Sequence, residues 1–374
     1  MASTPLAHRN NFDFLRLYFA ASVIITHSYS LTHTPEWDND WMALLTKHQA
    51  TFSWFGVRGF FIISGYLIYQ SLRRSRNPLD YFWKRMLRIY PALLVMLGMV
   101  YLLGGIVYPG GYHAYWGNPS AKNFVLHNLN LFYNDQQYGI EGIFPDNPIA
   151  GVVNGSIWTI PYEFFFYICL MVLFLMRRKW DKYLAIFGFL LLLNLYFFKE
   201  IQPWKVVNLD SGYIIELGLF FMGGTALATM NIENYYHKNK LFFFSVIFMV
   251  LCIYYKNFSV FVFLFLPLVV ILFGQYATPF LRSIGSRFGD VSYGVYIYGY
   301  PIQQTLLHYF KLNYLSLMIW SLVLSIVAGY ISWHVVEKTA MKFKKFHFSI
   351  GGLFRKVRTK LVPARVTEQQ EVEG

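Results

Sequence analysis

The chain has 374 residues, of which 56% are hydrophobic, 20% aromatic and 14% charged, whereas ordinary globular domains carry about 25% charged residues. Apolar stretches close to the ~20 residues that cross a bilayer recur along the whole chain, which predicts a polytopic membrane protein and argues against a soluble one. The two cysteines, Cys169 and Cys252, both lie in apolar stretches. A structural disulfide or a thiolate metal site is therefore not expected.

Ten apolar segments predict an all-α bundle of about ten transmembrane helices. In chain order they are residues 12–31, 55–72, 89–108, 153–176, 183–198, 212–230, 241–255, 258–273, 289–309 and 314–336. The seventh and eighth are divided only by Lys256 and Asn257. Residues 1–11 are polar, and no small-residue cleavage site follows the first segment, so we expect the first helix to be retained rather than cleaved. No internal repeat is visible, so inverted transporter symmetry has no support.

Basic residues gather in alternate connections, which sets the expected orientation. They follow the second, fourth and tenth segments: Arg73, Arg74, Arg76, Lys84, Arg85 and Arg88; then Arg177, Arg178, Lys179 and Lys182; then nine Lys and Arg residues between 338 and 365. Because cytoplasmic loops are enriched in Lys and Arg, this pattern predicts both termini in the cytoplasm. We attribute the net charge of +13 to topology and contact with anionic membrane lipid. Nucleic-acid binding is the alternative, and we expect no such partner.

The chain is expected to consist of a membrane domain followed by a tail, and one long connection interrupts the helices of the domain. Residues 1–337 are expected to form one membrane-embedded domain, and residues 338–374 a basic cytoplasmic tail whose polar end is disordered. The connection 109–152 is rich in Gly, Pro, Asn and aromatic residues, and loops of this length usually carry function or are disordered. Its rings at 112–116 suit stacking against sugars; an aromatic belt at the membrane interface is the alternative.

Arg16 and His27 are ionisable residues within the first predicted helix, where such groups are costly and mark candidate functional sites. Eleven residues separate them, which at ~100° per residue comes within ~20° of three full turns. The two side chains therefore share one helix face, ~16 Å apart along the axis. Arg16 is expected near the cytoplasmic end and His27 in the outer half. An imidazole titrates near neutral pH, which makes His27 a candidate general base.

Two carboxylates are candidates to assist His27. The fourth predicted helix runs inward from the external side, which places Glu163 at a depth similar to that of His27, and the sixth contributes Glu216. A carboxylate beside an imidazole orients it and stabilises its protonated form. The alternative is that Glu163 or Glu216 only pairs with Arg58 to hold helices together, and for Glu216 we favour this structural role.

Arg85 and Arg88 stand three residues apart where the third predicted helix begins. Residues at i and i+3 share a helix face, so the two guanidinium groups can converge on one anion and bind phosphate oxygens in a bidentate way. The alternative is an ordinary positively charged anchor on the cytoplasmic side. The pair gains significance from the other motifs of the chain.

Taken in order, these motifs resemble the acyltransferase-three family of integral-membrane O-acyltransferases, which modify bacterial surface polysaccharides, lipopolysaccharide and other glycans. The resemblance covers about residues 10–336. It rests on Arg16 with His27, residues 56–66 (Gly-Val-Arg-Gly-Phe-Phe-Ile-Ile-Ser-Gly-Tyr), Arg85 with Arg88, Ser156-Ile157-Trp158 with Glu163, and Ser292-Tyr293-Gly294-Val295-Tyr296 ending at Pro301. Each motif is weak alone, but the ordered set is specific.

The resemblance implies a role for each matching residue. Arg16 and His27 match the family's arginine–histidine motif, with the histidine as catalytic base. Arg85 and Arg88 match its paired arginines, thought to engage the acyl-coenzyme A donor. Glu163 matches its acidic residue on the Trp-containing helix.

Two positions depart from the family pattern. Arg58 stands where many members have Asp, which weakens any acidic role there. Gly299 replaces a histidine that many members carry two residues before the proline. Catalysis through that later histidine is excluded for this chain, which leaves His27 as the main candidate for the catalytic base.

The expected reaction is transfer of an acyl group, most plainly acetyl, from acetyl-coenzyme A to a sugar hydroxyl of a glycan or lipid-linked glycan. His27 would deprotonate the hydroxyl with Glu163 orienting it, without a metal; an acyl-histidine relay is the alternative. Arg16 would contact the donor or stabilise developing negative charge, or else pair helices. The expected location is the bacterial inner membrane. A transporter of acyl groups, lipids or glycolipids without chemistry is the main rival function, and a membrane sensor or scaffold is a third.

Overall fold

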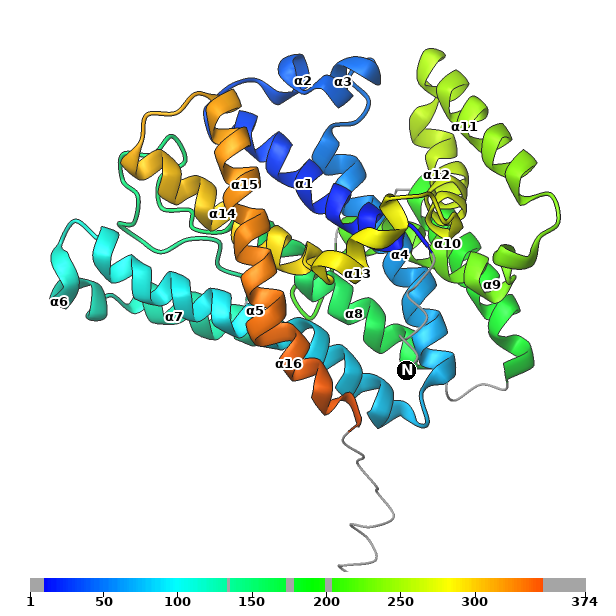
Figure 1. Ribbon diagram of the computed structural model, residues 1–374, viewed down its shortest axis with the longest axis horizontal. Coiled ribbons are helices and arrows are strands. Elements are labelled where there is room, and N and C mark those ends of the chain that lie inside the picture. Colours follow the sequence, from blue (N-terminus) through cyan, green and yellow to red (C-terminus); the bar gives the residue numbers. More distant parts are fainter. Residues whose placement is uncertain (1–9, 133–134, 173–177, 199–203, 346–374) are drawn as a thin grey trace, which may run out of the picture.

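The computed structural model of the chain describes residues 10–132, 135–172, 178–198 and 204–345, and nearly all of its regular structure is helical (Figure 1). The longer helices are α1 (Phe12–Ser30), α4 (Phe52–Arg74), α5 (Pro78–Val107), α8 (Thr159–Met171), α9 (Asp181–Phe197), α10 (Ser211–Thr229), α11 (Lys238–Tyr254), α12 (Phe258–Gln275), α14 (Ser292–Tyr309) and α15 (Tyr314–Ser332). The predicted all-α class is confirmed.

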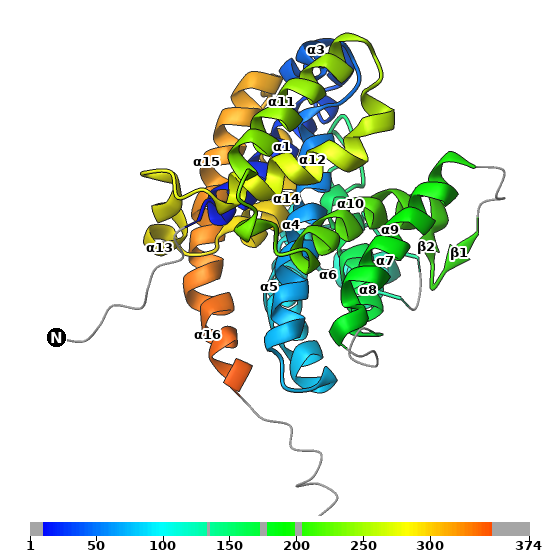
Figure 2. The same cartoon turned by 90° about the vertical axis from the view of Figure 1, so that its right-hand side faces the viewer.

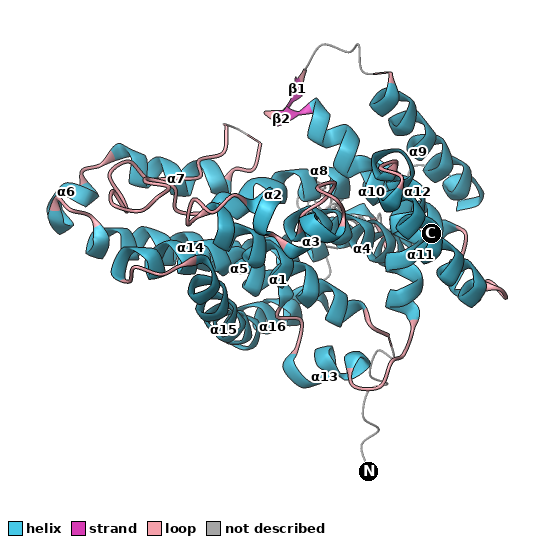
Figure 3. Ribbon diagram, turned by 90° about the horizontal axis from the view of Figure 1, so that it is seen from above, coloured by secondary structure: helices cyan, strands magenta, loops and turns pink. Residues whose placement is uncertain are grey.

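Short elements connect these helices (Figure 3). The short α-helices are α2 (Glu36–Asn39), α3 (Trp41–Leu45), α6 (Gly111–Trp116), α7 (Pro119–Leu129), α13 (Ile284–Phe288) and α16 (Lys338–Met341). The 3-10 turns are η1 (Gly155–Trp158), η3 (Arg178–Trp180), η4 (Ile232–Asn234), η5 (Leu281–Ser283) and η7 (Lys342–Lys345), and η6 (Trp333–Glu337) is a π-helix. One antiparallel hairpin joins β1 (Lys205–Val206) to β2 (Leu209–Asp210), with Lys205 opposite Asp210.

A helix lies within each of the ten predicted segments, although the last four residues of the fourth segment, 173–176, fall outside the described part of the chain. Within the described residues, five helices are long and apolar enough to cross a membrane: α4, α5, α10, α12 and the continuous run Tyr314–Lys344. The helices in the other segments are shorter or more polar. The number of crossings and the side of the termini stay predictions.

Helix α5 begins eleven residues before the predicted segment, at Pro78 instead of residue 89. The side chain of Asn77 accepts a hydrogen bond from the backbone N–H of Asp80, and Pro78 occupies the first turn. Asn as N-cap with Pro at the first helical position is a strong helix start. Arg85 and Arg88 therefore lie two to three turns inside a 30-residue helix, where their side chains are held by a rigid element.

Helix α4 lies at the centre of the bundle, between α1 and α10, because glycines allow the three backbones to approach closely. A Cβ on Gly65 would collide with the carbonyl of Phe221 in α10, and one on Gly224 would collide with that of Ile62 in α4. The hydroxyl of Thr225 donates to the carbonyl of Gly65 at 3.2 Å. Small residues are typical of packed membrane helices, since close packing replaces the hydrophobic effect there.

The connection 109–152 contains two helices, α6 and α7, which pack against the end of α5 and against each other (Figures 1 and 3). Two of its rings, Tyr115 and Trp116, are not free for the sugar stacking considered above. Tyr115 is completely buried, and the ring of Trp116 lies 4.7 Å from that of Tyr101. Tyr112 alone of these three is more than half exposed. The aromatic residues mainly build the contact between α5 and α6.

The predicted domain boundary at residue 337 falls inside a continuous helical run. Helix α15 passes through the π-helix η6 into α16 and η7, ending at residue 345. This run packs beside the first half of α5, as Figure 2 shows. Residues 338–345 are therefore part of the helical body, and the remainder of the predicted tail lies outside the described residues.

Candidate active site

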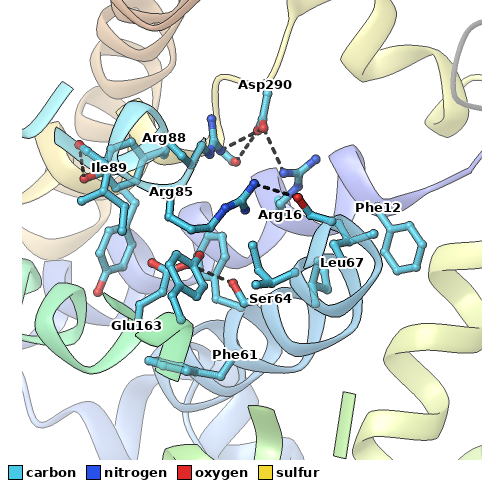
Figure 4. A pocket seen from close by; sticks show the side chains of 18 of the residues that line it. Phe12, Arg16, Phe61, Ser64, Leu67, Arg85, Arg88, Ile89, Glu163 and Asp290 are labelled. Atoms are coloured by element: carbon cyan, nitrogen blue, oxygen red, sulfur yellow. Dashed lines mark hydrogen bonds and ion pairs between the residues drawn. The ribbon is translucent and has the colours of Figure 1, made fainter. Parts of the chain in front are cut away.

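The central helices and the last helical run enclose a cavity of about 360 Å³ (Figure 4). Its polar lining comes from α1, α4, α5, α8, the segment before α14, and η7: Asp13, Arg16, Ser64, Ser71, Arg74, Arg85, Arg88, Glu163, Tyr167, Asp290 and Lys344. Four predicted site residues, Arg16, Arg85, Arg88 and Glu163, thus meet in one cavity. The fifth, His27, does not line it.

Asp290 joins two of the predicted cations (Figure 4). Its Oδ2 accepts from Arg16 Nη1 at 2.9 Å and lies 2.8 Å from Arg88 Nη2. Arg16 also pairs with Asp13 on its own helix, three residues earlier. Burial alone would raise the pKa of Asp290, but the two guanidinium groups lower it to about 2. Arg16 therefore links α1 to the start of α14, which is the helix-pairing alternative kept open for it.

Arg88 is compensated by a second carboxylate. Its Nη1 lies 3.3 Å from Oε2 of Glu337, a buried residue of the π-helix η6. The hydroxyl of Ser332 donates to the other oxygen of Glu337 at 3.0 Å. Arg88 thus enters the cavity already paired with Asp290 and Glu337. Arg85 and Arg88 share a helix face as predicted, but they do not form an equivalent pair.

Arg85 is the cation left for a ligand. It is 8% exposed, its Nη2 donates to Ser71 at 3.1 Å, and no ion pair to it occurs among the described residues. Its guanidinium lies 5.8 Å from the ring centres of Tyr81 and Tyr167, and its buried Nε has no hydrogen-bond partner there. A buried charge without a partner is costly, so this arrangement favours an anionic ligand in the cavity.

Glu163 lies on α8 and accepts hydrogen bonds from two hydroxyl groups. Ser64 of α4 donates at 2.9 Å, and Tyr167, one turn further along α8, donates as well. The expected contact between Glu163 and His27 is absent. Ser156, which approaches His27, precedes Glu163 by seven residues, and this corresponds to ~10 Å along a helix. Glu163 is therefore displaced from the residue that His27 contacts, and the common membrane depth of His27 and Glu163 stays a prediction.

His27 contacts the start of the Trp-containing helix instead. Its Nδ1 lies 3.5 Å from the hydroxyl of Ser156 in η1, and its ring meets that of Tyr300 edge to face, 5.2 Å between centres. No hydrogen bond to its Nε2 occurs among the described residues. One ring nitrogen is thus oriented, although weakly, and the other is free. An imidazole held at one nitrogen and open at the other is compatible with a role as base.

A layer of two hydroxyl-bearing side chains separates the cavity from His27. The hydroxyl of Tyr296 donates to the carbonyl oxygen of Ser156 at 2.7 Å and lies 2.8 Å from Oγ1 of Thr159. Tyr296 and Thr159 both line the cavity. The predicted single cavity from His27 to the arginine pair is therefore interrupted. A polar path nevertheless continues from the cavity through Tyr296 and Ser156 to His27.

Two further predictions concern residues outside the cavity. Arg58 pairs with Glu216 at 2.7 Å, and its guanidinium lies 4.8 Å from the ring centre of Trp54. The structural role favoured for Glu216 is thus confirmed. At Gly299, where many family members carry histidine, any Cβ would lie 2.8 Å from the side chain of Ile24 in α1. Across the described ranges, no group of three or more His, Cys, Asp or Glu is placed to hold a metal ion.

Asp290 and Glu337 are the site residues that the sequence analysis missed. Both carried a signal, since the whole chain has only 19 acidic residues and both lie beside a predicted helix end. Asp290 directly precedes the motif Ser292–Tyr296, and Glu337 directly follows the last apolar segment. Which cations they pair with depends on helix packing.

The comparisons with known proteins identify the family of the chain. The family model for an acyltransferase domain of the acyltransferase-three type matches residues 9–335. An O-acetyl transferase of Shigella phage Sf6 is 27% identical over 341 residues, which is 88% of this chain and 96% of that protein. Nodulation protein 10 of Rhizobium leguminosarum bv. viciae is 31% identical over 182 residues, 47% of each. No solved structure matches significantly.

The match begins before α1, ends at residue 335 within η6, and includes every predicted site residue. Membership of an acyltransferase family argues against the two rival functions, a transporter without chemistry and a membrane sensor or scaffold. With the apolar helices and the arginine-lined cavity at its centre, the chain belongs to the acyltransferase-three family and is a membrane O-acyltransferase.

Proposed function

We propose that the enzyme transfers an acetyl group from cytoplasmic acetyl-coenzyme A to a hydroxyl group of a surface polysaccharide, lipopolysaccharide or other glycan. The observation that carries the donor assignment is Arg85, a buried cation without an ion pair in a cavity of about 360 Å³. A guanidinium binds phosphate oxygens in a planar, bidentate way. The sulfur-linked arm of the donor is long and uncharged, and suits the apolar side chains Phe60, Phe61 and Leu67 deeper in the cavity.

The reaction needs one base. In the proposed step, Nε2 of His27 removes the proton from the sugar hydroxyl while its oxygen attacks the thioester carbonyl. The carbon–sulfur bond then breaks, the ester forms, and the thiolate of coenzyme A recovers the proton from His27. A direct transfer of this kind requires no metal and no acyl-enzyme. Since Tyr296 and Thr159 lie between the cavity and His27 and are hydrogen-bonded to each other, the acyl end of the donor reaches His27 only when this hydrogen bond opens.

Ser156 and Trp158 support an acceptor site near His27. Ser156 orients the imidazole, and Trp158 lies two residues further on, with its ring 4.8 Å from that of Tyr213. Tyr213 is 44% exposed. Exposed aromatic rings beside hydrogen-bonding groups offer an amphipathic surface of the kind that sugar rings stack on. The acetyl group is supported by the name of the phage relative, an O-acetyl transferase.

We further propose a multi-pass protein of the bacterial inner membrane with about ten crossings and both termini in the cytoplasm. The distribution of Lys and Arg supports this orientation. Asn10 and Lys344, close to the two ends of the described chain, line the same cavity. Two chain ends at one side of a bundle agree with an even number of crossings.

The test compares surface glycans from cells with and without the gene by mass spectrometry. O-acetyl groups should be present in the first sample and missing in the second, and a plasmid copy should restore them. A copy with His27→Ala should be expressed in the membrane without restoring them. Identical acetylation in the presence and absence of the gene would contradict the proposed acceptor class. Transfer of radioactive acetyl from acetyl-coenzyme A to glycan in isolated membranes checks the donor.

A further inference from the structure

The last helical turns of the chain form one wall of the cavity mouth. Residues 338–345 lie beyond the family match, which ends at 335, yet they pack on α5. The indole N–H of Trp83 donates to the carbonyl of Phe343 at 3.1 Å. Lys344, the next residue, is half-buried and lines the cavity. This wall lies outside the residues that the family model matches.

The π-helix η6 sets the direction of that wall. A π-turn inserts one residue into an α-helix and so rotates everything that follows. Here it brings Glu337 to Arg88 and Ser332. Lys344 follows roughly two turns later and reaches the same cavity. The side chain of Lys344 is thus positioned by a helix that an ion pair and a hydrogen bond hold against α5.

Arg74, the last residue of α4, lines the same cavity as Lys344. It is exposed at the rim. Ser71, one turn earlier on α4, holds Arg85 at 3.1 Å. Among the described residues, neither Arg74 nor Lys344 has an ion pair, whereas Arg16 and Arg88 are compensated by three carboxylates. The mouth therefore carries two uncompensated cations outside the buried Arg85.

A buried cation with further unpaired cations in the same cavity suits a ligand that carries phosphate at two places. Coenzyme A has a diphosphate, which leads into its long neutral arm, and a separate monoester on the 3′ carbon of the ribose. A phosphate monoester carries a charge of about −1.5 to −2 at neutral pH and three acceptor oxygens. Two cations at an open rim match that dianion. The single buried guanidinium of Arg85 is placed for the diphosphate at the entrance to the apolar part.

We propose that Arg74 and Lys344 bind the 3′-phosphate of the coenzyme A donor and so select it over acyl carriers that lack this group. The proposal rests on the proposed function, in which acyl-coenzyme A is the donor. Dephospho-coenzyme A and protein-bound phosphopantetheine keep the arm but lack the 3′-phosphate. Neither would use the rim cations.

The test is a titration of the full-length purified protein in neutral detergent with coenzyme A and with 3′-dephospho-coenzyme A. The wild type should bind coenzyme A about tenfold more tightly, the size expected of ion-assisted hydrogen bonds. Arg74→Ala/Lys344→Ala should lose this preference while its affinity for dephospho-coenzyme A stays unchanged. Lys344→Arg should keep it. Lys342→Ala is the matched control, since Lys342 is exposed on the same turn and does not line the cavity.

Each other result overturns the proposal. Equal binding of both nucleotides by the wild type, or a preference that survives in the double variant, would remove the rim site and leave the donor assignment intact. If the wild type binds neither nucleotide, both the rim site and the assignment of coenzyme A as donor are contradicted. The titration is repeated in nanodiscs with and without anionic lipid. A preference that disappears when anionic lipid is present would assign Arg74 and Lys344 to lipid phosphates instead, and an unchanged preference supports the nucleotide.

Discussion

Arg88 and Asp290 form an ion pair of 2.8 Å between α5 and the segment that leads into α14. The same carboxylate binds Arg16 of α1, so one acidic residue holds three parts of the bundle around the cavity. Because of this pairing, the two arginines of α5 have different roles. Arg88 stabilises the site, and Arg85 stays available for a ligand.

Asp290→Asn should destabilise the protein, because Arg16 and Arg88 would keep their charges and lose the shared carboxylate. Breaking a buried ion pair on one side costs about 3 kcal/mol or more, so we expect a clearly lower unfolding temperature in detergent. The matched control is Asp135→Asn. Asp135 pairs with Lys205 at 3.4 Å, but both side chains are more than 60% exposed, and exposed pairs contribute about 1 kcal/mol at most. Equal effects of the two variants would contradict the role given to Asp290.

The pH dependence of stability should reflect the same carboxylate. Asp290 lies in the connection between α13 and α14, and its pKa is lowered from 3.8 to about 2. A group with a lowered pKa in the folded state stabilises the protein above its unfolded pKa, and the contribution is lost as pH falls. The unfolding temperature of the wild type should therefore fall between about pH 4 and pH 2. Asp290→Asn should show a smaller fall in that range; an equal fall would assign it to other carboxylates.

The sequence predicted the helical segments well because length and apolarity alone mark a helix in a bilayer. It missed the true start of α5, since the charged residues after Pro78 lower the apolarity that was used to delimit the segment. It also missed α7, although Asn118 and Pro119 form the same cap-and-proline start as Asn77 and Pro78. Local capping signals were more informative than composition at both places.

The site was predicted in part. The periodicity of α1 and α5 identified Arg16, Arg85 and Arg88, and these do meet in one cavity. The predicted contact between His27 and Glu163 is not found, because Ser156 contacts His27 and Ser64 and Tyr167 contact Glu163. The Trp-containing helix begins with the 3-10 turn η1, so Ser156 and not Glu163 reaches His27. The partners of Arg88 could not be predicted, since Asp290 and Glu337 approach it only through tertiary packing.

Arg85 and Arg88 should respond differently to substitution. Arg85→Ala should weaken coenzyme A binding by roughly tenfold or more, because an ion-assisted bidentate contact is lost, with little change in unfolding temperature. Arg85→Lys should restore only part of the affinity, since the planar fork is missing. Arg88→Ala should mainly lower the unfolding temperature, because Asp290 and Glu337 are left without their cation. Both quantities are measured on the same preparations by calorimetric titration and thermal unfolding. The reverse pattern would reassign the donor contact to Arg88.

His27→Ala should lower the rate of acetyl transfer by about 10²–10⁴-fold, the usual contribution of a general base, with coenzyme A affinity unchanged because His27 lies outside the cavity. Ser156→Ala should lower the rate by a smaller factor, since the 3.5 Å contact to Nδ1 only orients the ring. If Glu163 acted on His27, Glu163→Gln would alter the pH–rate profile as His27 variants do. We expect no such change, because the recorded partners of Glu163 are Ser64 and Tyr167. Rates are measured in isolated membranes with acetyl-coenzyme A, and near-normal transfer by His27→Ala would give the residue a structural role only.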